Sequence, residues 1–167
     1  MRERSQSARE ELAAVLPEVP VVEMVYRRRP RAERAALREE FNEAVRQDFL
    51  RHLASGREAE LRKRGFTERN LESLRNGRVP HGYNVHHIKP LDDGGDNRFD
   101  NLVLMRAHPD HEAVHRYLDP QLKGLEHGQA RTVRIPMVEP GIHARAGRDE
   151  MKHAEAARMS RWAGREI

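Results

Sequence analysis

A stripe of hydrophobic residues runs through the stretch from Arg31 to Ala54, where an apolar side chain recurs every four positions. The stripe consists of Leu37, Phe41, Val45, Phe49 and Leu53. This repeat is close to the 3.6 residues of an α-helical turn. The pattern therefore predicts one long helix whose gently drifting apolar face is buried in the core.

Two shorter helices are expected after the long one. Ser55 and Glu58 have the spacing of a capping box and predict a helix that ends at Gly65. Thr67 is expected to cap the next helix, and Gly77 is expected to end it. Residues up to about 78 thus form a helical layer.

The middle of the chain predicts a β-hairpin followed by a helix. Residues 83–88 are β-prone and lead into a turn at residues 92–95. The apolar run at residues 102–105 is too short for a confident helix and is expected to pair back on the first strand. A helix should follow from about Pro109 to Leu118.

The two ends of the chain give weaker patterns. The N-terminal residues contain prolines at 17 and 20 and the basic run Arg27-Arg28-Arg29-Pro30, which is typical of a connecting arm. Residues 132–138 alternate as an edge strand, and a last helix is expected from about Ala144 to Trp162. The fold class is therefore α+β and mainly helical. Its expected segments are an arm or linker at 1–30, a helical layer at 31–78, a core at 79–120, and a C-terminal extension at 121–167 packed on that core.

The composition is that of a highly charged chain of 167 residues, 35% of them charged and 37% hydrophobic. No apolar run approaches the roughly 18 residues of a membrane span, so no membrane partner is expected. The 31 basic residues outnumber the 27 acidic ones, and their arginines favour a polyanionic partner. There is no cysteine, so a metal site must use His, Asp, Glu or Asn. No cleavable signal sequence is expected, because residues 1–17 are charged.

Four histidines carry the most informative chemistry. His86 and His87 are adjacent in the first hairpin strand, and His111 and His115 are four residues apart, on one face of the following helix. We expect His86, His111 and His115 to bind one metal ion and to leave an open position on it. His87 is then free to act as a base. Because adjacent side chains of a regular strand point to opposite faces, the strand is expected to twist or bulge at this doublet.

One segment resembles the HNH endonuclease signature of the ββα-metal superfamily. It reads Val85-His86-His87-Ile88-Lys89-Pro90-Leu91, then Gly94-Gly95, Asn97, Asn101-Leu102, His111 and His115. The greatest similarity is to the nuclease domains of DNase colicins and pyocins and of related bacterial polymorphic toxins. The resemblance covers roughly residues 78–118, about a quarter of the chain, and it implies a central ββα-metal motif.

The resemblance also implies roles for individual residues. His86, His111 and His115 would bind one divalent ion, which would be Zn, Mg, Mn or Ni. His87 would be the general base, and Asn101 would brace the loop that orients it. The further catalytic arginine and glutamate of colicin-type enzymes have no evident counterpart, because Asn84 stands where an acidic residue is expected. Candidates for phosphate contacts are Arg78, Lys89, Arg98, Arg106 and Arg116.

The implied activity is hydrolysis of DNA phosphodiester bonds with little sequence preference. The implied role is that of an antibacterial toxin or effector, delivered into the cytoplasm of a target bacterium as a bacteriocin or by a type VI secretion apparatus. In the producing cell it would be cytoplasmic and neutralised by a cognate immunity protein, and residues 1–30 would link it to a delivery domain. A phage-associated or restriction-associated HNH endonuclease is the competing context.

Two other functions use the same residues. His111-Glu112-Ala113-Val114-His115 matches the His-Glu-x-x-His motif of zinc metalloproteases, in which the glutamate is the base. The metzincin continuation is absent, because Leu118 and Gln121 stand where glycine and histidine are required. The other alternative is a non-catalytic, zinc-stabilised nucleic-acid-binding module, which would have little use for an unligated His87.

Overall fold

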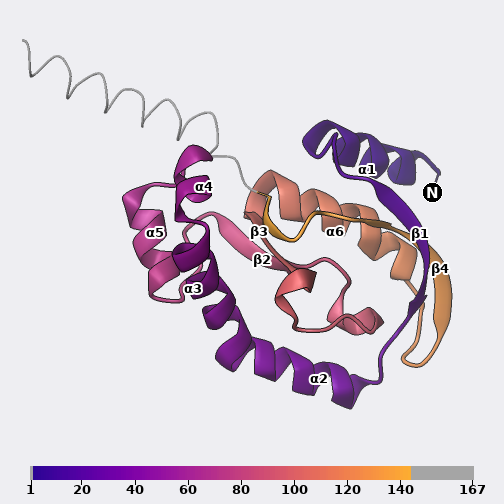
Figure 1. Cartoon of the computed structure of the whole chain (residues 1–167). Coiled ribbons are helices and arrows are strands. Elements are labelled where there is room, and N and C mark those ends of the chain that lie inside the picture. The colour runs from indigo at the N-terminus through magenta and orange to yellow at the C-terminus, as the bar shows by residue number, and fades with distance from the viewer. Residues whose placement is uncertain (1, 144–167) are drawn as a thin grey trace, which may run out of the picture.

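The computed structural model describes residues 2–143 of the chain, and these residues form an α+β fold (Figure 1). The α-helices are α1 (Arg2–Val15), α2 (Arg31–Glu40), α3 (Arg46–Gly56), α4 (Glu58–Lys63), α5 (Glu68–Arg75) and α6 (Glu112–Leu118). The strands are β1 (Val21–Arg27), β2 (Tyr83–His87), β3 (Leu102–Arg106), β4 (Ala130–Pro136) and β5 (Gly141–His143). The last expected helix, from about residue 144 to residue 162, lies outside the described residues.

The predicted long helix is present, with a π-helical segment, η1 (Phe41–Val45), between α2 and α3. The four-residue repeat explains this segment. In a regular α-helix each step of four residues turns about 40° beyond a full turn, so a stripe with that spacing rotates around the helix. A π-helical turn holds an extra residue and absorbs that rotation. Phe41, Phe49 and Leu53 therefore all reach the same hydrophobic core.

The two helices after it test the predicted caps. Thr67 is confirmed as an N-cap, since its hydroxyl accepts from the backbone NH of Asn70 at 3.1 Å and its own NH donates to the Asn70 side chain at 3.0 Å. The predicted Ser55 cap is wrong. Burial of residues 53 and 54 continues α3 past Ser55, whose hydroxyl donates to the backbone carbonyl of His52. α4 then begins without a side-chain cap.

The predicted hairpin is confirmed. β2 and β3 are antiparallel, with Tyr83 opposite Arg106 and His87 opposite Leu102, and β5 adds to β3 in parallel. Residues 102–105 are buried, because β3 lies between the helical layer on one side and α1 and α6 on the other. Residues 107–111 lead from the hairpin into α6, so β2, β3 and α6 follow one another along the chain as strand, strand and helix.

The N-terminal residues do not form the connecting arm expected from the sequence. α1 packs along α6 and buries Leu12 and Leu16 against it and β3 (Figure 1). β1 pairs antiparallel with β4 in a two-stranded sheet, and Tyr26 is buried there. The apolar faces of a helix and a strand are enough to hold this segment on the body, with Pro17 and Pro20 placed at the turn between them.

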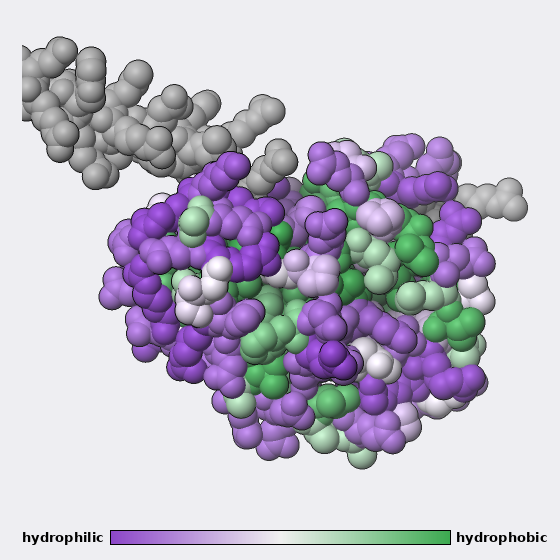
Figure 2. All heavy atoms as spheres, in the orientation of Figure 1, coloured by the Kyte–Doolittle hydropathy of each residue, from purple (hydrophilic) through white to green (hydrophobic). Residues whose placement is uncertain are grey.

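The surface agrees with the charged composition. In Figure 2, hydrophilic residues cover most of the visible face, and hydrophobic residues show between them in smaller groups. Within residues 2–143, no helix combines the length and the apolar character needed to cross a bilayer.

Candidate metal centre

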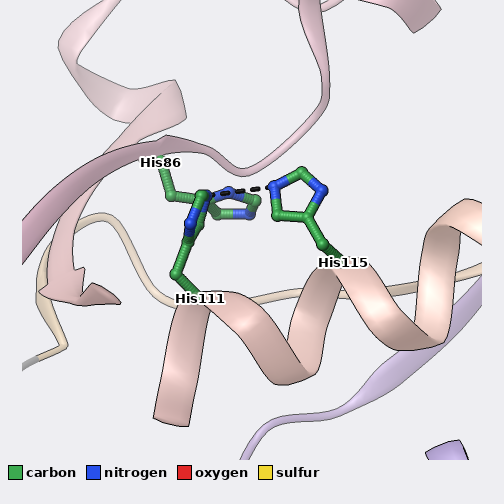
Figure 3. A group of neighbouring side chains, drawn as sticks. All are labelled: His86, His111 and His115. Carbon is green, nitrogen blue, oxygen red and sulfur yellow. Dashed lines mark hydrogen bonds between the residues drawn. The ribbon is translucent and has the colours of Figure 1, made fainter. Parts of the chain in front are cut away.

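Three of the predicted histidines converge. His86 comes from β2, His111 immediately precedes α6, and His115 lies one turn further along that helix. Figure 3 shows their rings pointing toward one another. One nitrogen from each ring lies within 4.8 Å of the others, and the Nε2 atoms of His111 and His115 are 3.0 Å apart. This cluster could hold a metal ion.

The state of His86 indicates that a cation suits this cluster. The side chain is 6% exposed, and its buried Nε2 has no hydrogen-bond partner among the described residues. Burial, and then the other histidines, lower the pKa of His86 well below its usual value, and burial lowers the pKa of His111 to about 4. Both rings are therefore neutral at pH 7 and carry a lone pair. Imidazole ligands of this kind suit Zn²⁺ and similar divalent ions.

Contacts behind the cluster orient two of the rings. Nδ1 of His115 lies 3.2 Å from a carboxylate oxygen of Asp119, so it donates there and leaves the lone pair on Nε2. A carboxylate partner such as Asp119 fixes the tautomer and direction of a ligand histidine. The amide nitrogen of Asn84, which stands where the resemblance places an acidic residue, donates to Nδ1 of His111 at 3.2 Å. In this arrangement the proton of neutral His111 is on Nε2, which donates to Nε2 of His115.

His87 lies beside the cluster without joining it. Its Nε2 is 3.0 Å from Oδ1 of Asn97, to which it donates, so the lone pair is on Nδ1. The amide nitrogen of Asn97 in turn donates to the backbone carbonyl of Leu37 in α2 at 2.9 Å. Burial lowers the pKa of His87, which keeps the imidazole neutral and able to accept a proton at pH 7.

The two adjacent histidines share one cavity of about 400 Å³, which His111 and His115 also line. This happens without the predicted bulge: His86 pairs with Val103 and His87 with Leu102, so the ladder contains no extra residue. The doublet ends β2, and the cavity borders both residues there.

Asn101 forms hydrogen bonds with the segment that follows the His86-His87 doublet. Its Oδ1 accepts from the backbone NH of Lys89 at 2.8 Å, and its amide nitrogen donates to the carbonyls of Lys89 and Asp96, both at 2.9 Å. This ties the exit of β2 to the loop that carries Asn97. The geometry is that of a brace for the loop beside His87.

The basic residues singled out from the sequence lie away from this cavity. Arg106 pairs with the buried Asp110, Arg116 pairs with Glu11 and Glu112, and Arg98 pairs with Asp100. Arg78 is exposed outside it, and Lys89 borders a different pocket.

Other residues that line the cavity or support it were given no site role from the sequence. They are Arg34, Arg38, Asn42, Arg46, Asn84 and Asp119, with Asn97 behind His87. Those at 34, 38, 42 and 46 share the four-residue spacing of the apolar stripe, but this spacing alone does not show that they reach the cavity.

Glu112, the base of the protease alternative, is engaged elsewhere. Its carboxylate pairs with His108 and with Arg116 on the outer side of α6. It does not line the cavity that the histidines share. His108, three residues before His111 in the sequence, is exposed and outside the cluster.

The chain is similar to a protein of Escherichia coli (strain K12) that bears the name "Uncharacterized protein YhhZ". The two are 40% identical over 117 residues, which are 70% of this chain and 29% of that relative. The chain therefore spans less than a third of the relative's length. No protein-family model matches the sequence, and no solved structure matches it. The case for a function accordingly depends on the geometry of the histidine cavity.

Proposed function

We propose that this protein is a metal-dependent HNH-type endonuclease that hydrolyses DNA phosphodiester bonds with little sequence preference. One observation carries the proposal: three histidines converge as ligands while a fourth, held in a defined tautomer, faces the same cavity. The order of β2, β3 and α6 around these residues supports the ββα-metal assignment. A purely structural ion would have no need for the fourth imidazole.

His86, His111 and His115 would hold the ion, which supplies Lewis-acid stabilisation of negative charge on the phosphate and its leaving oxygen. His87 acts on water: Nδ1 takes a proton as the water oxygen attacks phosphorus in line. The bond to the 3′ oxygen breaks and that oxygen takes a proton from solvent, so the products are a 5′-phosphate and a 3′-hydroxyl. Asn97 holds Nε2 throughout, which leaves the lone pair on Nδ1 of a residue that lines the cavity.

The metalloprotease alternative has less support. It requires Glu112 to face the metal-bound side of the helix, whereas this carboxylate pairs with His108 and Arg116. It also gives no role to His87 and Asn97.

We further propose an antibacterial role as a toxin or effector, delivered to a target cell and restrained in the producer by an immunity protein. The resemblance to bacteriocin and polymorphic-toxin nucleases supports this role. The similarity to a segment of a much longer protein is compatible with a nuclease module joined to other domains. A phage-associated or restriction-associated enzyme is the competing context. Expression of the wild type in a heterologous bacterium should arrest growth, and harmless accumulation of active enzyme would contradict the toxin role.

The activity is tested by incubating supercoiled plasmid with the wild type and with His87→Ala, each with Mg²⁺, Mn²⁺, Ni²⁺ or Zn²⁺. Loss of a general base should slow nicking by about 10²- to 10⁴-fold. His81→Ala, at an exposed histidine outside the cavity, is the matched control and should nick normally. A wild type that shifts the plasmid band without nicking it would indicate the non-catalytic binding module instead.

A further inference from the structure

Arginines from the long helix line the cavity that contains the four histidines. Arg34 and Arg38 lie in α2, and Arg46 begins α3. They lie outside the segment that resembles the HNH signature. Their place in the cavity is therefore independent of that resemblance.

The aromatic ring of Phe41 lies next to Arg38, Arg46 and His87. The guanidinium carbons of the two arginines lie 5.7 and 5.8 Å from the centre of the Phe41 ring. The imidazole of His87 packs edge-on against that same ring, with 4.5 Å between the ring centres. Phe41 is buried and holds its place in the core. It therefore sets two positive charges beside the proposed base.

These charges lack an acidic partner. Arg34 shares Asp92 with Arg28, but no carboxylate of residues 2–143 forms an ion pair with Arg38 or Arg46. Arg38 is exposed at the rim of the cavity, and partial burial, followed by the neighbouring charges of Arg34 and Arg46, lowers its pKa. Most other arginines of this helical region are neutralised, for example Arg57 and Arg64 by Glu60. An anion in the cavity would relieve the repulsion between the three guanidinium groups.

The π-helical segment explains why both arginines reach the cavity. In a regular α-helix, residues eight apart point about 80° away from each other. η1 lies between Arg38 and Arg46 and accommodates an extra residue, so the pair behaves like residues seven apart, which differ by only about 20°. π segments of this kind are frequent at functional sites. The π-helical segment therefore aligns both the apolar stripe with the core and the two arginines with the cavity.

We propose that Arg38 and Arg46 form a clamp that binds a phosphate group of a nucleic-acid strand beside His87, and that it does so without metal. The identity of the ligand rests on the proposed nuclease function, whereas the anion site itself rests on the geometry above. Two guanidinium forks match the paired oxygens of a phosphodiester, and they would hold it where a water beside Nδ1 of His87 can reach phosphorus. Arg34, whose charge is shared with Asp92, contributes less.

The clamp is tested by binding of a fluorescein-labelled single-stranded oligodeoxynucleotide in EDTA, followed by anisotropy over a range of salt concentrations. The slope of log K against log salt is negative, and the loss of one phosphate contact should make it shallower by about 0.7. We expect that reduction for Arg38→Gln and for Arg46→Gln, and about twice as much for the double variant. Arg69→Gln, an exposed change in α5 outside the cavity, should keep the wild-type slope. Unchanged slopes in all variants would overturn the clamp, as would equally strong competition by oligoglutamate.

A second substitution separates charge from geometry. Arg38→Lys keeps the positive charge and should keep most of the salt slope, while the affinity falls because the fork is lost. Equal affinity for this variant and the wild type would contradict two-pronged binding. Failure of the clamp is distinguishable from failure of the nuclease. A wild type that nicks plasmid while the arginine variants bind normally removes only the clamp. A wild type that never nicks, with binding that still depends on both arginines, removes only the nuclease.

Discussion

Replacing His86 with leucine is expected to have opposite effects with and without a divalent ion. In EDTA the wild type buries an imidazole nitrogen that has no partner, and an unsatisfied buried polar atom costs about 1–3 kcal/mol. Leucine removes that polar atom and places an apolar side chain beside the rings of His111 and His115. The variant should therefore be at least as stable as the wild type in EDTA, by up to about 1 kcal/mol, or about 3 °C in Tm for a chain of this size.

Adding metal should make the wild type more stable than His86→Leu. An ion at a hundred times its Kd stabilises the folded state by about 2.7 kcal/mol, which raises the Tm by about 8 °C. His86→Leu leaves only two of the three histidines and should lose most of that rise. The measurement is thermal unfolding followed by circular dichroism at pH 7.5, in EDTA and with Zn²⁺ or Ni²⁺. At that pH the lowered pKa values of His86 and His111 make both rings neutral ligands.

His81→Leu is the matched control and should keep the full rise with metal, because His81 is exposed and outside the cluster. Two results would refute the reasoning. One is an equal rise with metal in His86→Leu and the wild type, which would place the ion elsewhere. The other is a fall of several kcal/mol in the free energy of unfolding of His86→Leu in EDTA. That result would show that the imidazole serves the packing of the core and that its nitrogen is not kept for a metal ion.

Three further substitutions test other parts of the structure. Leu12→Ala should destabilise the protein by about 2–4 kcal/mol in urea unfolding, because this side chain is 3% exposed in the core beside α6; a loss below about 0.5 kcal/mol would restore the view of residues 1–30 as an arm. Asn101→Ala removes three hydrogen bonds to the backbone of Lys89 and Asp96 and should lower both the Tm and plasmid nicking, and normal nicking would show that the brace does not serve His87. Glu112→Gln should nick plasmid within about twofold of the wild type, whereas the protease alternative makes this change fatal.

Local patterns predicted most of the elements that surround the site. The strand before the doublet, the buried run at 102–105 and the Thr67 cap each depend on neighbours in the sequence, and each is confirmed. The convergence of His86 with His111 and His115 was predicted as well, because the hairpin and helix leave few ways to arrange them.

What the sequence did not predict depends on distant contacts. The N-terminal segment was interpreted as an arm because its prolines and arginines dominate its composition. Its apolar face, however, is matched by α6 and β4, which lie about a hundred residues further along the chain. The cavity arginines were missed for a similar reason: only the π-helical segment brings Arg38 and Arg46 to one side, and a four-residue spacing alone does not reveal it. Asn97 was quoted as part of the motif, but its bond to His87 depends on the path of the loop.

The two hydrogen bonds of Asn97 join elements that belong to different layers, since one amide contacts both His87 and the backbone of α2. The imidazole is therefore tied to the main chain of the helix that carries Arg34 and Arg38, as well as to its own strand, β2. A displacement of that helix by an ångström would be transmitted to the imidazole through a single rigid, planar group. A ligand that moved this helix would therefore also move the imidazole.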